Sequence, residues 1–165
     1  MAIADSMLAE FDQEARTTRR VLERVPSDKL DWGPHPRSMT IGVLALHIAG
    51  TPGFVVQMGS VDAYEMSPFT PPVPSSTAEI LATYDQTMAA AREFVAGLDD
   101  AKALAMWSLV MGGKTIFAMP RIAMIRMILM NHCYHHRGQL SVYLRLLDVP
   151  VPSIYGPSAD ENPFA

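Results

Sequence analysis

The stretch PRIAMIRMILMNHCYHHRGQLSVYLRLL, residues 120–147, predicts a long helix with one apolar side. Pro120 suits the first position of a helix, where its missing N–H group costs nothing. One side of this helix would carry apolar and histidine side chains together: Ile125, Leu129, His132, His136, Tyr143 and Leu147. Because residues four apart lie one turn apart on the same face, His132 and His136 should both point into the core.

Three further helices are predicted upstream of this stretch. Residues 5–25 repeat apolar side chains every three or four positions, and Pro26 ends the pattern. A second helix begins near Ser38 or Thr40, and Pro52 either kinks it or ends it. A third follows the capping box of residues 76–79 and runs to about residue 97.

The connections are long and rich in proline. Four prolines between residues 66 and 75 predict an extended loop. Residues 99–119 are the least regular, although Gly112 and Gly113 favour a tight turn, with a small hairpin flanked by Trp107 and Ile116 as one option. We therefore expect a single all-α domain over residues 1–165: a four-helix bundle with up-down-down-up connections.

The composition excludes several classes of function. Thirteen basic and 17 acidic residues give a net charge of -4, which predicts no nucleic-acid partner. One cysteine, Cys133, cannot form an intrachain disulfide, so a reducing cytoplasmic location is expected. The N-terminus has no basic segment typical of a signal peptide. The most apolar stretch, residues 122–130, is short and contains Arg126, so no membrane partner is expected.

Three histidines are candidate metal ligands. His47 follows Leu44 by three positions on the second helix, so it should face the same interior as His132 and His136. Buried imidazoles need partners for both ring nitrogens, and a metal ion provides one. Three neutral imidazoles suit zinc or nickel and leave coordination positions open, as in catalytic sites.

Simpler interpretations compete with this site. A His pair at this spacing can also lie on a surface or be hydrogen-bonded in a core. His135 points about 100° away from His136 and is the weaker ligand candidate. Cys133 is interpreted as a small core or interface residue and His35 as a surface residue. Arg137 is interpreted as a partner in a structural ion pair or as a residue that binds a helix end.

Several segments, in this order, resemble the DinB family of helical-bundle proteins, which is unrelated to the DNA polymerase of that name. The strongest is residues 132–140, HCYHHRGQL, followed by YLR at 143–145. Residues 149–152 and 155–161 are also similar, as are residues 32–35, 38–42 and 46–49. The resemblance covers nearly the whole chain and implies a metal site made of His47, His132 and His136.

The resemblance also implies possible activities. Relatives include metal-dependent transferases that use a low-molecular-weight thiol, a thiol-dependent isomerase and metal-dependent hydrolases, and many form dimers. We therefore expect a metal-dependent thiol S-transferase or hydrolase that acts on a small molecule, as a homodimer. The alternatives are a non-catalytic metal-binding, ligand-binding or stress-linked helical dimer module, and a purely structural dimer with no metal. No general acid or base can be assigned among Tyr84, His135 and Arg137, and residues 66–75 and 99–119 should line part of any substrate pocket.

Overall fold

The structure is a computed structural model that describes residues 3–164, and most of these residues are helical. Its longer helical elements are α1 (Ile3–Leu22), α2 (Ile41–Gly59), α3 (Thr77–Ala96) and a final run of α5 (Arg121–Ile125), η2 (Arg126–His132) and α6 (Cys133–Leu146). The short elements are η1 (Ser27–Lys29) and α4 (Asp100–Leu104). Three strands complete the fold: β1 (Ala63–Glu65), β2 (Met106–Met111) and β3 (Lys114–Pro120).

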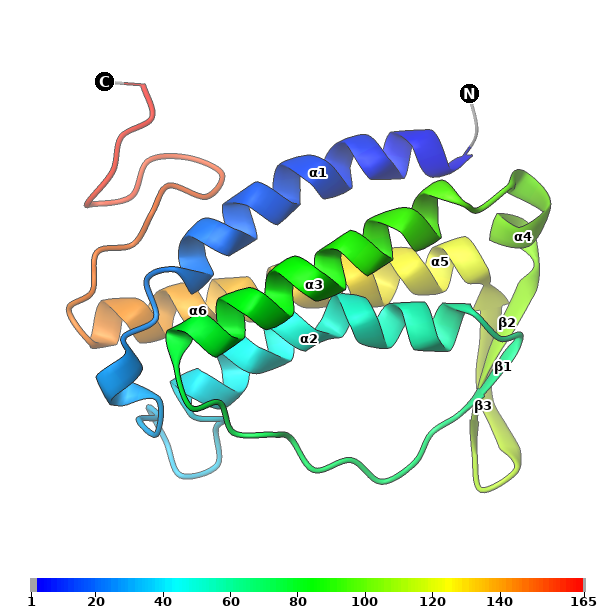
Figure 1. The fold of residues 1–165 in the computed structure, drawn as a ribbon, viewed down its shortest axis with the longest axis horizontal. Helices are drawn as coiled ribbons and strands as arrows, with labels where there is room; N and C mark the ends of the chain where they lie inside the picture. Colours follow the sequence, from blue (N-terminus) through cyan, green and yellow to red (C-terminus); the bar gives the residue numbers. More distant parts are fainter. Residues whose placement is uncertain (1–2, 165) are drawn as a thin grey trace.

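The long helices lie side by side in two opposite directions, in the order that the sequence predicts. In Figure 1, α1 and the run from α5 to α6 point one way, whereas α2 and α3 point the other way. Their shared core is apolar and includes the fully buried Leu22, Ile48, Ile80 and Leu140. Burial of these apolar side chains is the main favourable contribution to the packing.

The helix starts follow the predicted capping residues. Thr40 precedes α2 and accepts a hydrogen bond from the amide of Val43, and Ser76 precedes α3 and accepts one from the amide of Glu79. The return bond of the capping box differs from expectation, because Glu79 accepts from the amide and hydroxyl of Ser75. The free amides at both helix starts are thus partly satisfied by side chains.

Pro52 does not end α2, which continues to Gly59. Within the described residues, α2 is also the one helix long and apolar enough to cross a bilayer by length and composition. The segment closest in length and composition to a membrane span is therefore in α2 and not at residues 122–130, as the sequence had indicated. Of the apolar window in α2, 61% is buried inside the protein, as expected for the core helix of a globular domain.

The prediction of an all-α chain is wrong, because the three strands form a sheet in the order β1-β2-β3. Strands β2 and β3 are an antiparallel hairpin whose turn contains Gly112 and Gly113, both with positive φ, which glycine adopts readily. Strand β1 pairs parallel to β2, with Ala63 opposite Ser108. The hairpin was one predicted option, but the pairing with β1 joins segments more than 40 residues apart and leaves no local signal.

The predicted helix over residues 120–147 is not uniformly α-helical. Pro120 precedes the first helical residue, and the middle segment, η2, is a π-helix that ends at His132. Such segments are rare and are frequently found at functional sites. Residues 66–75 form the predicted irregular loop, which runs from the sheet back to the start of α3 (Figure 1).

Candidate metal centre

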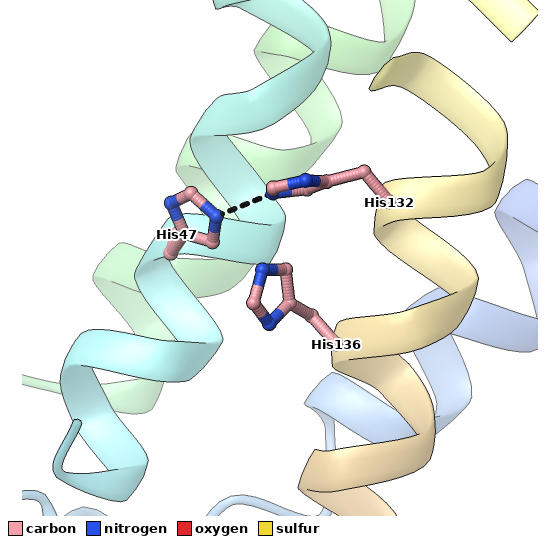
Figure 2. Close-up of side chains that lie close together, drawn as sticks. All are labelled: His47, His132 and His136. Carbon is pink, nitrogen blue, oxygen red and sulfur yellow. Dashed lines mark hydrogen bonds between the residues drawn. The ribbon is translucent and has the colours of Figure 1, made fainter. Parts of the chain in front are cut away.

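The structure brings the three predicted histidines together between two helices. His47 projects from α2, His132 from the last position of η2 and His136 from α6, and Figure 2 shows the three rings facing a common point. His132 and His136 are one turn apart, so one helical run presents both rings to the third. Helical spacing thus predicted that these rings lie together, and their role as metal ligands stays a prediction.

The distances between the rings suit a small ion. Nε2 of His47 lies 2.8 Å from Nε2 of His132, and the candidate ligand atoms of all three residues lie within 4.8 Å of one another. A tetrahedral zinc ion with Zn–N bonds of about 2.0–2.1 Å separates its nitrogens by about 3.3 Å. The three imidazoles could thus hold a metal ion after small side-chain rotations.

All three imidazoles favour the neutral form, which is the form that binds a metal. Burial, with a smaller contribution from His136, lowers the pKa of His47. Burial and the neighbouring histidines lower the pKa of His132 to about 4. Burial also lowers the pKa of His136, although the hydrogen bond with Gln139 acts in the opposite direction. Protons therefore compete less for these nitrogens than for those of an exposed histidine at the same pH.

One polar neighbour orients a candidate ligand, and a second contacts the backbone of another. Nδ1 of His136 is 2.7 Å from Oε1 of Gln139, so this nitrogen can donate to the amide oxygen while Nε2 remains free. The hydroxyl of Thr51 donates to the backbone carbonyl of His47 at 2.7 Å. The Gln139 contact is of the kind that fixes the tautomer of a metal-binding histidine.

A cavity of about 200 Å³ adjoins the cluster, and His47 and His132 line it. Its other walls are mainly apolar and come from α2, η2 and the sheet. Met66, Trp107, Leu109 and Phe117 lie in the two segments that the sequence analysis expected around a substrate pocket.

The other sequence candidates lie outside the cluster. Cys133 is buried, and burial raises the pKa of its thiol to about 12. His35 accepts a hydrogen bond from the amide of Arg37 in an exposed turn. His135 is exposed, with its ring beside that of His136, while the buried Tyr84 donates its hydroxyl to the carbonyl of Ala15.

Arg137 makes the structural ion pair that the sequence suggested. Its guanidinium is buried and lies 2.7 Å from the carboxylate of Glu14 on α1. It also donates to the hydroxyls of Thr18 and Tyr155, and it lies over the rings of Tyr134 and Tyr155. These contacts attach α6 to α1 and to the C-terminal tail.

Sequence reasoning missed two residues at the site. Gln139 lies three positions after His136 and Thr51 four positions after His47, so helical spacing could have indicated both. The cavity walls from the sheet had no comparable signal, because they depend on strand pairing.

Comparisons with known proteins give a consistent assignment. The model of the DinB family matches residues 1–163. The Bacillus subtilis (strain 168) protein named "Uncharacterized protein YrdA" is 28% identical over 162 residues, which cover 95% of this chain and 90% of YrdA.

Two solved structures share the fold. A DinB-like protein from Bacillus cereus ATCC 10987 has a TM-score of 0.74 at 24% identity, covering 93% of this chain and 98% of that one. The DinB-like protein YjoA from Bacillus subtilis has a TM-score of 0.67 at 15% identity, and the match covers 88% of this chain and 96% of YjoA. The family match over nearly the whole length, together with this fold, shows that the chain belongs to the DinB family.

Proposed function

We propose that this chain is a single-domain four-helix-bundle metalloprotein that binds one divalent ion through His47, His132 and His136. The observation that carries the proposal is the convergence of three imidazoles from two helices, with ligand atoms within 4.8 Å of one another. Two of the three rings also line a cavity. A core that needed only hydrogen bonds would gain little from three imidazoles facing one point.

The donor set favours zinc or nickel. Imidazole nitrogens are ligands of intermediate softness and suit these ions better than magnesium or calcium, which prefer oxygen. Among residues 3–164, no fourth His, Cys, Asp or Glu joins the cluster. Three protein ligands with a free position are typical of catalytic rather than structural zinc sites.

We propose further that the site is enzymatic, of the thiol S-transferase or hydrolase type. A bound divalent ion lowers the pKa of a coordinated thiol or water and so supplies a nucleophile near neutral pH. The protein's own residues would orient His136, through Gln139, and exclude water with the apolar cavity walls. A small-molecule substrate fits a cavity of about 200 Å³.

A cytoplasmic homodimer is part of the same proposal. The single cysteine, Cys133, is buried and reduced, which is compatible with a reducing compartment. Val142 and Leu146 are each 56% exposed and lie one turn apart on α6, which supports a contact between two copies there.

A non-catalytic binding module is the second candidate. It is favoured by the cavity lining, whose titratable side chains are His47 and His132 alone, so no separate general acid or base faces a ligand. An S-transferase can operate without one if the thiolate is already formed. Hydrolysis is therefore the less favoured of the two enzymatic options.

The decisive experiment measures bound metal after expression without a tag and dialysis without chelator. We expect close to one equivalent of zinc or nickel in the wild type and none in the double variant His132→Ala with His136→Ala. His35→Ala is the control, because that ring lies in an exposed turn away from the cluster. A wild type that neither contains nor takes up these ions would contradict the proposal.

A second experiment separates the enzyme from the binding module. Zinc-loaded wild type, chelator-treated wild type and the double variant are compared for transfer of a small thiol to a panel of apolar electrophiles. We expect turnover in the loaded wild type only. Turnover that persists in the double variant would exclude the three histidines as its source, and a loaded protein without turnover would favour the module.

A further inference from the structure

The cavity beside the histidines has a polar end and an apolar body. Helix α2 supplies one face of side chains at spacings of three and four, namely His47, Thr51, Phe54 and Met58. Ile128 and His132, four residues apart in η2, form the facing wall. The two imidazoles therefore lie together, and the helix positions that follow His47 are increasingly apolar.

The sheet forms the remaining wall. Trp107 and Leu109 lie two residues apart on β2, so their side chains share one face of the strand. Phe117 on β3 and Met66 after β1 extend this wall. The indole N–H of Trp107 donates to the carbonyl of Met58 at 2.8 Å. This donor is therefore already used, and Trp107 contributes only the apolar part of its ring to the cavity wall.

The lining contains no charged side chain that could pair with an ionised ligand. Its polar groups are His47, His132 and Thr51, and the hydroxyl proton of Thr51 is already donated to the carbonyl of His47. Transfer of a carboxylate or phosphate from water into such surroundings is strongly unfavourable. The apolar part of the cavity thus disfavours charged ligands, and it also disfavours ligands that need many hydrogen bonds.

The volume limits the size of the occupant. An engineered apolar cavity of about 150 Å³ holds one benzene molecule. The cavity here, at about 200 Å³, has room for a ring of that size with a short substituent.

We propose that this cavity binds the uncharged, apolar arm of the substrate, up to about the size of a substituted benzene ring. The reacting polar end of the substrate then lies at His47 and His132, and this part rests on the proposed metal site. A hydrophilic thiol cosubstrate would approach from outside the cavity. Leu109, Phe117 and Ile128 would be specificity-determining residues.

The test uses thiols as probes, because a thiolate binds zinc and leaves its other end free to enter the cavity. Zinc-loaded protein is titrated calorimetrically with ethanethiol, propanethiol, butanethiol and pentanethiol. We expect the affinity to rise about fourfold per methylene. The matched charged probe, 3-mercaptopropionate, should bind at least about tenfold more weakly than butanethiol. Equal affinity across the series, or a preference for the carboxylate, would overturn the proposal.

Cavity-filling variants locate the effect. Leu109→Phe fills part of the cavity from the sheet, and Ile128→Phe fills part of it from η2. Each variant should reduce the increase in affinity with thiol chain length while leaving the zinc content unchanged. Met111→Phe is the matched control, because Met111 lies on the same strand but is 52% exposed. Unchanged chain-length dependence in both filled variants would show that the probes bind elsewhere.

A measurement without metal keeps the two proposals distinguishable. Toluene is added to chelator-treated wild type, and the NMR signal of the Trp107 indole N–H is followed. A saturable shift that Leu109→Phe abolishes supports the apolar site even if zinc does not bind. Zinc uptake at one equivalent with no toluene effect and no chain-length dependence would leave the metal site intact and overturn this inference.

Discussion

The two sides of the helix segment from His132 to Arg137 differ in how their polar groups are paired. On the side facing α2, His132 and His136 meet His47, with one hydrogen bond among the three rings and one to Gln139. On the side facing α1, the Arg137 guanidinium is matched by a carboxylate, two hydroxyls and two aromatic rings. Six consecutive residues thus carry an incompletely paired cluster and a fully paired one.

The difference indicates which cluster does chemistry. A charged group that is buried and completely paired contributes to structure, because moving any partner leaves an uncompensated charge. Neutral rings whose nitrogens converge without other partners retain capacity for a ligand. The contrast predicts that variants on the two sides will separate stability from metal binding.

The largest expected effect on stability is that of Arg137→Met. Removing the guanidinium leaves Glu14 buried with a single phenolic partner, Tyr155, so the free energy of unfolding should fall by about 3–5 kcal/mol. Denaturant unfolding of metal-free protein measures this loss. Arg145→Met is the matched control, because Arg145 pairs with Asp160 at the surface and its loss should leave the melting temperature nearly unchanged. Equal destabilisation by the two variants would remove the distinction.

The next effect is stabilisation by metal. Zinc at a free concentration of 100 times its dissociation constant should stabilise the wild type by about 2.7 kcal/mol. The double variant His132→Ala with His136→Ala should show no such gain, whereas its metal-free stability should differ from the wild type by about 1 kcal/mol or less. Thermal unfolding with and without zinc measures both. A large loss of metal-free stability would mean that the histidines are structural.

Gln139→Ala tests the contact that orients His136. Removing the amide should weaken zinc affinity by about 10–100-fold, as for other residues that hydrogen-bond the second ring nitrogen of a metal-binding histidine. Competition against a chromophoric chelator measures the affinity. Gln57→Ala on the exposed side of α2 is the control and should have no effect. An unchanged affinity in Gln139→Ala would show that His136 is oriented by packing alone.

The effect that is smallest near neutral pH is the pH dependence of the stability of metal-free protein. The pKa of each clustered imidazole is lowered in the folded state, so the unfolded chain takes up protons first as the pH falls. Their contribution to stability is therefore present above pH 6.5 and is lost as the pH falls towards about 4, the pKa of His132. Unfolding of wild type and double variant between pH 7.5 and 4 should show a shallower decline for the variant. Parallel curves would contradict the lowered pKa values.

The sequence alone was most informative where structure depends on neighbours within one or two turns. The caps at Thr40 and Ser76, the i, i+4 pair His132 and His136, and the inward direction of His47 all follow from helical spacing. The order of the helix directions also agrees with the expectation, although it is not a local property. The glycine pair at 112 and 113 indicated the hairpin turn for the same reason, since its backbone requirement is local.

Only the tertiary structure decided the pairing of β1 with β2, the π-helical segment before His132 and the cavity between α2, η2 and the sheet. The parallel pair joins segments more than 40 residues apart, and neither segment shows a residue pattern that indicates the pairing. No residue pattern in the sequence indicated the π-helix within the predicted α-helix. The sequence therefore determined which residues can form the candidate metal site, because helix geometry is local. The fold decided what lies beside that site, because a cavity is the space left by packing of distant segments.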